Sequence, residues 1–323
     1  MSTVQTIRGA VDSSILGRTL SHEHLTNGVS GMERIPGLLR RDEMVGRCVA
    51  ALERVRSSGI DTVIDLTPFD LGRQAWLFEK VAERTTVNVI CATGVYRWIP
   101  PIYFDWDEDE IAGHFAREIT EGIEGTSLRA GIIKLAWDLE YRLNEGMPRF
   151  TPRGQLEKTA RAAARAAKAT GVPISCHTRA VDELGTPLLD IFEDEGLDLR
   201  SVTIGHSNDT TDLAYLNALA RRGAVVGLDR FFSSAEEYVA QRGGVALALI
   251  KAGFADQVCL GHDASPAGLW GRWRDPNPEC WTLVPDVEVP WLLAHGASAD
   301  DIDAVLRRSI RATFEAAARM TTK

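Results

Sequence analysis

The sequence predicts a single (β/α)8 barrel of the TIM type, in which eight parallel strands alternate with helices. Eight short runs rich in Val, Ile and Leu are separated by longer segments with helical periodicity. The runs are almost continuously apolar, which is typical of strands covered on both faces in a parallel sheet. The length of 323 residues suits one such barrel with extended loops, and no linker or low-complexity tract divides the chain. We therefore expect one domain over residues 1–323.

The predicted strands follow one another along the chain, after a short extension over Val4–Gly17. They cover Thr19–His24, Thr62–Thr67, Val87–Gly94, Ala130–Ala136, Val172–Thr178, Ser201–Ser207, Ala224–Arg230 and Val258–Ala264.

The segments between these runs carry helix signals. Asp42–Ser57 begins with acidic residues and ends with basic ones, the distribution that the helix dipole favours. Gln155–Thr170 and Leu213–Arg222 each stop before a glycine, Gly171 and Gly223, which is common just after a helix. This regular alternation of strand and helix predicts the barrel.

Composition disfavours several classes of partner. The formal net charge of −9 argues against nucleic acid, whose phosphates require a basic face. No apolar run approaches the roughly 20 residues that span a bilayer, so no membrane contact is expected. The five cysteines are scattered without CxxC spacing, and residues 1–10 contain no apolar segment typical of a secretory signal. We therefore expect a reduced, cytoplasmic protein.

Residue types that bind metals gather at the C-terminal ends of the predicted strands. His22 and His24 end the first run two residues apart, so both side chains point the same way. In a barrel these strand ends meet at one mouth, where active sites are built. The corresponding ends of later strands hold Lys134, His177, His206 and Asp263.

Each of these residues has an ordinary structural explanation when taken alone. A strand-end histidine is often a hydrogen-bonded core residue, a lysine can extend to the surface, and an aspartate can cap a turn. The convergence of four of the seven histidines on one mouth is harder to explain in this way, because buried polar groups need partners and a metal is a partner that they can share.

The other three histidines are expected to be structural. His114 and His295 fall on helical segments away from strand ends. His262 neighbours Asp263, so strand alternation turns it to the opposite face.

Lys134 requires a separate explanation, because a protonated ammonium cannot bind a cation. Carbamylation by CO2 would convert it into an anionic bridge between two ions about 3.5–4 Å apart, the usual spacing in two-metal hydrolases. Such ions generate hydroxide near neutral pH and polarise a carbonyl or phosphoryl oxygen. The alternative is an aldolase-type barrel in which Lys134 forms a Schiff base.

Six segments show a resemblance to a known family that runs nearly from end to end. They are GRTLSHEHL (Gly17–Leu25), DLTPFDLGR (Asp65–Arg73), RAGIIKLA (Arg129–Ala136), ISCHT (Ile174–Thr178), IGHSNDTTDLAYLNALARRG (Ile204–Gly223) and GLDR (Gly227–Arg230). On these segments the chain resembles the phosphotriesterase family of the amidohydrolase superfamily, most closely the phosphotriesterase-like lactonases. The GIIK and IGHSND segments are the most specific of them.

The resemblance implies two divalent metal ions, of zinc or else of iron, cobalt or manganese. The expected ligands of the more buried ion are His22, His24 and Asp263. The expected ligands of the more exposed ion are His177 and His206. Carbamylated Lys134 and a hydroxide would bridge the two ions, and these lactonases are usually homodimers.

The resemblance also implies catalytic roles around the metals. Asp263 would take the proton from the attacking water, and Asp209 would pass on a proton or order the pocket. Tyr96 matches the lactonase tyrosine that contacts the bridging hydroxide and the lactone ring. Arg230 matches the lactonase pattern, where true phosphotriesterases carry histidine. Its neighbour Asp229 is expected to be structural.

Trp98 and Trp270 are expected to shape the substrate pocket, together with Tyr96 and Arg230. Trp270 belongs to a Trp-, Pro- and Gly-rich segment that follows the last predicted strand. The chain departs from the family pattern at Ala264, where many lactonases carry an aromatic residue, and over Trp137–Arg149, which is longer than usual. These departures affect the substrate pocket and leave the metal ligands intact.

The expected function is therefore hydrolysis of small-molecule lactones or esters, such as acyl-homoserine lactones or alkyl lactones. Organophosphate triesters are expected as weaker substrates, because their tetrahedral centre resembles the intermediate of acyl hydrolysis. Two alternatives stay open: phosphotriester hydrolysis as the main activity, and a metal-loaded binding protein without catalysis.

Overall fold

The computed structural model describes residues 2–138, 152–269, 277 and 279–321. Eight parallel strands lie in one sheet in the order of the chain, from β3 to β10. The strands are β3 Thr19–Glu23, β4 Thr62–Asp65, β5 Asn88–Gly94, β6 Ile132–Trp137, β7 Ile174–Thr178, β8 Val202–Gly205, β9 Val225–Leu228 and β10 Val258–Leu260. One strand falls in each predicted run, and the prediction of a (β/α)8 barrel is confirmed.

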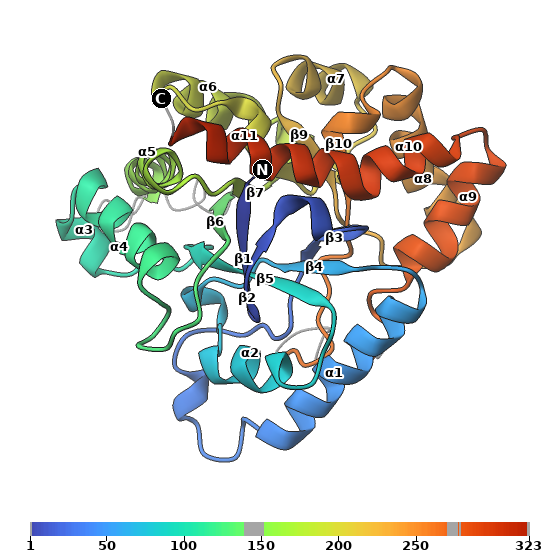
Figure 1. The fold of residues 1–323 in the computed structure, drawn as a ribbon. Helices are drawn as coiled ribbons and strands as arrows, with labels where there is room; N and C mark the ends of the chain where they lie inside the picture. Colours follow the sequence, from blue (N-terminus) through green and yellow to red (C-terminus); the bar gives the residue numbers. More distant parts are fainter. Residues whose placement is uncertain (1, 139–151, 270–276, 278, 322–323) are drawn as a thin grey trace.

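Helices surround these strands (Figure 1). They are α1 Arg41–Ser57, α2 Ala75–Ala82, α3 Ile102–Asp105, α4 Glu108–Thr120, α5 Pro152–Thr170, α6 Gly185–Asp194, α7 Leu213–Arg221, α8 Glu236–Lys251, α9 Val289–Ala294, α10 Ala299–Asp303 and α11 Ser309–Met320. The predicted helices Asp42–Ser57, Gln155–Thr170 and Leu213–Arg222 correspond to α1, α5 and α7. No helix in the described part of the chain combines the length and apolarity needed to cross a membrane.

The predicted N-terminal extension is an antiparallel hairpin of β1 Thr3–Thr6 and β2 Gly9–Asp12. Ile7 lies in the turn of this hairpin, and its amide donates to the carbonyl of Val89, near the start of β5, at 2.8 Å. The hairpin therefore covers the N-terminal end of the barrel, opposite the mouth.

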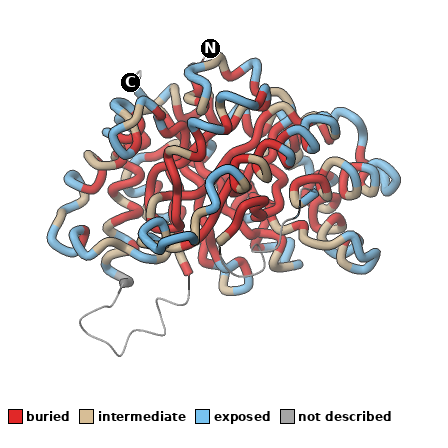
Figure 2. The backbone as a smooth tube through the Cα atoms, turned by 90° about the horizontal axis from the view of Figure 1, so that it is seen from below, coloured by how far each residue is buried: buried red, intermediate tan, exposed pale blue. Residues whose placement is uncertain are grey.

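The apolar core forms two layers, and buried residues concentrate along the central strands (Figure 2). The larger layer lies between the strands and the surrounding helices. A smaller cluster joins inward-facing strand residues to the hairpin and to α11, and consists of Val4, Leu16, Ile64, Leu66, Ile90, Ala92, Ile132, Val225, Cys259, Ile310 and Phe314. Apolar side chains therefore fill the N-terminal end of the barrel, and polar groups occupy the mouth at its C-terminal end.

The barrel closes where β10 meets β3. The Ser21 hydroxyl donates to the Leu260 carbonyl at 2.9 Å, and the Asp263 amide donates to the His22 carbonyl at 2.9 Å. Gly261 makes this approach possible, because a Cβ there would lie 2.8 Å from the His22 amide nitrogen. A side chain at this position would push the two strands apart.

Near the C-terminus, a buried carboxyl group faces α8. Glu288 ends the π-helical turn Val284–Glu288, is 1% exposed, and has no hydrogen-bond partner for either carboxyl oxygen among the described residues. Gly243 of α8 leaves room for it, since a Cβ there would lie 3.0 Å from Glu288 Oε2. Burial raises the pKa of Glu288 to about 8, although the charge of Arg242 opposes the shift. The folded protein therefore holds a neutral carboxyl here at neutral pH.

We predict that Gly261→Ala lowers the free energy of unfolding by about 1–3 kcal/mol, because the new Cβ overlaps the His22 backbone. Chemical denaturation measures the change. Gly244→Ala is the matched control, since a Cβ at Gly244 of α8 meets nothing within 4 Å and alanine favours a helix. Equal stability of Gly261→Ala and wild type would contradict this account of barrel closure.

We predict that Glu288→Gln removes part of the pH dependence of stability. The folded pKa is raised from 4.5 to about 8, so the folded state keeps a proton that the unfolded chain has lost. Stability should therefore fall as pH rises from about 4.5 to about 8, by up to about 1.4 kcal/mol per pH unit, and level off above that range. Denaturation at pH 6 and pH 9 should show a smaller loss in Glu288→Gln. If wild type and Glu288→Gln lost the same stability between pH 6 and pH 9, Glu288 would already be ionised in the folded protein at pH 6.

Candidate metal centre

The predicted metal ligands lie together at the mouth of the barrel. Together with neighbouring groups they line a cavity of about 300 Å³. All six are buried. His22, Lys134 and His177 lie on β3, β6 and β7, and His24, His206 and Asp263 follow the ends of β3, β8 and β10.

Three donors converge on one point in the inner part of the cavity. His24 Nε2 lies 3.1 Å, and His22 Nε2 3.7 Å, from Asp263 Oδ1. Ligand atoms of these three residues lie within 4.8 Å of one another, as the ligands of one ion would. Lys134 Nζ lies 3.1 Å from His22 Nε2. These are the residues that were predicted to hold the more buried ion.

Asp229 orients one ligand from each expected metal site. Its Oδ2 lies 2.6 Å from His22 Nδ1, and its Oδ1 lies 2.8 Å from His206 Nδ1. Thr67 Oγ1 lies 2.9 Å from Nδ1 of His24 in the same way. Histidine ligands usually bond to an oxygen through the ring nitrogen that does not face the metal. The Nε2 atoms of all three rings are thus left for a metal.

Asp229, which was expected to be structural, is a buried carboxylate that orients two of the predicted ligands. Asp229 lies within 4.8 Å of His22 and His206, but it contacts the ring nitrogens that face away from the other donors. The signal that could have found it is its position at the end of a strand, as a carboxylate at the mouth of the barrel.

His177 presents the opposite ring nitrogen. Its Nε2 lies 2.8 Å from Oδ2 of Asp138, while its Nδ1 is buried and has no hydrogen-bond partner among the described residues. The His177 and His206 rings meet edge to face with their centroids 4.4 Å apart. An unpaired buried nitrogen beside a second histidine fits a metal ligand. Sequence analysis did not identify Asp138, which lies in the segment after the lysine strand.

Protonation in the cavity suits metal binding. Burial, followed by the charge of Lys134, lowers the pKa of His22 to about 4. Burial also lowers the pKa of His177 to about 4 and that of Lys134 to about 8. The imidazoles of His22 and His177 are therefore neutral, as ligands must be, and Lys134 has a larger share of the neutral amine that reacts with CO2. The residues present therefore fit the binding of divalent metal ions.

Two of the predicted ligands have an unusual backbone conformation. His206 and Asp263 have φ angles of 59° and 50°, in the left-handed region that non-glycine residues seldom adopt. The amide of His206 donates to Asp229 at 2.7 Å, and the amide of Asp263 donates to the His22 carbonyl. Such strain persists only where neighbouring contacts hold it, and it is concentrated at functional sites.

Arg230 and Asp209 form a charged network beside the metal ligands. Arg230 Nε lies 3.3 Å from Oδ2 of Asp263, and its Nη1 pairs with Asp209. Arg242 of α8 donates to the other oxygen of Asp209 at 2.9 Å. Tyr238 lies one helical turn before Arg242 on α8, and its hydroxyl donates to the Arg230 carbonyl at 2.7 Å. Because two guanidinium groups hold Asp209, its contacts favour the ordering role over proton transfer.

The predicted pocket residues occupy different positions. Tyr96 lines the cavity, and its ring meets that of His177 edge to face at 5.2 Å. Trp98 is 43% exposed and contacts Tyr96 with a centroid distance of 6.1 Å, outside the described lining of the cavity. Trp270 lies outside the described residues. Asp70 accepts from the amides of Tyr96 and Trp98 at 2.8 and 3.0 Å and so shapes their loop.

The remaining histidines lie outside the cavity, as predicted. Nδ1 of His262 lies 2.6 Å from Oε1 of Glu23, and its Nε2 accepts from the Val284 amide at 2.9 Å. His114 contacts the Tyr103 hydroxyl, and His295 Nδ1 lies 2.8 Å from the Trp291 carbonyl oxygen. These bonds give the three rings structural roles.

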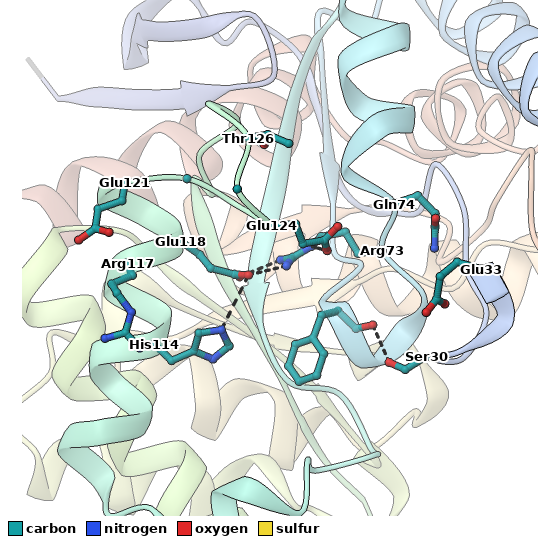
Figure 3. A pocket seen from close by; sticks show the side chains of 13 residues that line it. Ser30, Glu33, Arg73, Gln74, His114, Arg117, Glu118, Glu121, Glu124 and Thr126 are labelled. Carbon is teal, nitrogen blue, oxygen red and sulfur yellow. Dashed lines mark hydrogen bonds and ion pairs between the residues drawn. The ribbon is translucent and has the colours of Figure 1, made fainter.

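A larger cavity of about 780 Å³ lies beside α4 and the loop after β4 (Figure 3). Its fully buried Arg73 donates to Glu118 and to the Ala92 carbonyl, at 2.9 and 2.8 Å. Thr93 donates to the same carboxylate at 2.6 Å. The buried charges of this cavity therefore satisfy one another, so we place the chemistry in the smaller cavity, where ligand atoms converge.

Comparison with known proteins agrees with this site. Residues 2–314 match the model of the phosphotriesterase family. The chain is 32% identical over 316 residues to the aryldialkylphosphatase of Saccharolobus solfataricus, covering 95% of this chain and 98% of the relative. It is 34% identical over 341 residues to a phosphotriesterase homology protein of Mycobacterium tuberculosis, covering 98% of each. An N-acetyltaurine hydrolase of Xenopus tropicalis is 20% identical, over 94% of this chain and 95% of the relative. The chain therefore belongs to the phosphotriesterase family and is a metal-dependent hydrolase.

Proposed function

We propose that this protein hydrolyses small-molecule lactones or esters at a centre of two divalent ions. The observation that carries the proposal is the convergence of the ligand set in one cavity, which Tyr96 and Arg230 also line. His22, His24 and Asp263 would hold one ion, His177 and His206 the other, and carbamylated Lys134 would bridge them. Bound there, the ions would supply a hydroxide near neutral pH and polarise the scissile carbonyl.

The protein's own groups would orient the substrate and control protons. Burial raises the pKa of Tyr96, so its phenol stays protonated and can donate a hydrogen bond to a substrate oxygen. Arg230 holds Oδ2 of Asp263, which leaves Oδ1 beside the histidines. Asp263 would then take the proton of the attacking water. Asp209 holds Arg230 in place through its own ion pair with the guanidinium group.

Two features support a lactonase over a phosphotriesterase. Arg230 stands where the resemblance gives true phosphotriesterases a histidine, and Tyr96 matches the lactonase tyrosine. Phosphotriester hydrolysis as the main activity is the second candidate, because a relative 32% identical is named an aryldialkylphosphatase. Membership in a hydrolase family argues against a binding protein without catalysis. It also argues against Schiff-base chemistry at Lys134.

Zinc as the metal, a homodimeric state and a cytoplasmic location stay predictions.

We predict about two transition-metal ions per wild-type chain and a loss of both metal and activity in Lys134→Ala, since the bridge is removed. Elemental analysis and lactonase assays on the same preparations measure both quantities, and activity should fall at least about 100-fold. Lys80→Ala is the control, because Lys80 is an exposed partner of Glu83. A wild-type protein that is active without metal would refute the two-ion centre.

We predict that kcat/KM for alkyl lactones or acyl-homoserine lactones exceeds that for a dialkyl aryl phosphate by at least about tenfold. The reason is that the triester only resembles the tetrahedral intermediate for which the lactonase site is built. Steady-state kinetics with both substrate classes on one metal-loaded preparation make the comparison. Efficient triester turnover with inert lactones would reverse the assignment.

A further inference from the structure

The two ring nitrogens of His177 have different surroundings, and Asp138 causes the difference. Asp138 Oδ2 accepts from Nε2 at 2.8 Å, which places the ring proton on Nε2. Nδ1 is then the unprotonated nitrogen, and it is the buried atom without a described partner. The other histidines bond through Nδ1 instead, to Asp229 or Thr67. His177 therefore offers Nδ1 to the cavity, whereas the other three histidine ligands offer Nε2.

The position of Asp138 follows from the geometry of β6. Lys134, Ala136 and Asp138 alternate along one face of the strand and its extension. Ala136 pairs with His177 in the parallel register between β6 and β7. β6 thus carries the predicted bridging lysine, and the carboxylate that orients His177 follows directly after the strand, two residues beyond Ala136. Asp138 is only 4% exposed, so this contact is well shielded from water.

Asp138 also links the metal ligand to the substrate pocket. Arg97 Nη2 donates to Asp138 Oδ2 at 2.6 Å, the oxygen that also contacts His177. Arg97 lines the cavity and follows Tyr96 directly, and its guanidinium lies 5.2 Å from the centre of the Tyr96 ring. One carboxylate oxygen therefore holds both a ligand ring and the loop that carries the tyrosine.

We propose that Asp138 is a positioning residue that selects Nδ1 of His177 as a metal ligand, and so sets the affinity of one ion and not of the other. The inference rests on the proposed two-ion centre. Asp229 provides the contrast, because it contacts His22 and His206, one ligand from each expected site. Loss of Asp138 should disturb a single site, whereas loss of Asp229 should disturb both.

The test is titration of metal-free protein with Co²⁺, followed by calorimetry and by equilibrium dialysis. Wild type should bind two ions. In Asp138→Ala the ion expected on His177 should lose about 10–100-fold in affinity, the usual effect of removing the partner of a ligand, with the other ion changed less than about twofold. Asp138→Asn should recover part of the loss, because its amide oxygen can still accept from Nε2. Asp229→Asn should weaken both ions.

Asp212→Ala is the control for general destabilisation. Asp212 caps α7 by accepting from the amides of Ala214 and Tyr215, so its loss should cost about 1 kcal/mol of stability and leave both affinities unchanged. Unchanged binding in Asp138→Ala, or equal weakening of both ions, would overturn the role of Asp138. Fewer than two ions bound to the wild-type protein would overturn the two-ion centre itself. Because this outcome needs no variant, it is distinguishable from failure of the role of Asp138.

Discussion

Closure of the barrel between β10 and β3 is the constraint on which the rest of the site depends. The backbone bond from Asp263 to His22 joins the two ends of the sheet and at the same time joins two predicted ligands of one ion. Gly261 permits the approach because it has no Cβ. The left-handed φ of Asp263 then turns its carboxylate toward His24, at 3.1 Å. Closing the fold and assembling the inner metal site are thus one structural event.

Burying so many polar groups at the mouth is costly unless each has a partner. Asp229 satisfies two imidazoles and the His206 amide with its two oxygens. Asp138 satisfies a third imidazole. These bonds leave one ring nitrogen of each histidine at the cavity, together with Lys134. A cation would give Nδ1 of His177 the partner that the described residues do not supply.

The sequence could predict the strands and the ligand residues because both depend on local pattern. Apolar runs marked all eight strands, and the strand-end position of His177 or Asp263 was enough to place it at the mouth. Ring orientation is a different kind of information. The bond from Asp229 to His22 spans 207 residues of sequence and depends on barrel closure, which brings the ends of β9 and β3 to the same mouth, so no local pattern contains it. Asp138 was missed for the same reason. Trp98 lies outside the described cavity lining, although it contacts Tyr96 and belongs to the same loop, whose amides donate to Asp70.

The loop after β5 links the predicted substrate pocket to the predicted metal ligands. Its backbone is fixed by Asp70, whose burial raises its pKa to about 7 although the amides of Tyr96 and Trp98 oppose the shift. Its Arg97 side chain is fixed by Asp138, which in turn holds His177. A substitution in the loop can therefore reach the metal centre through two bonds, and a change at the metal centre can move Tyr96. Relatives carry the names aryldialkylphosphatase and N-acetyltaurine hydrolase, and in this chain the predicted pocket residue Tyr96 is coupled through Arg97 and Asp138 to the predicted ligand His177.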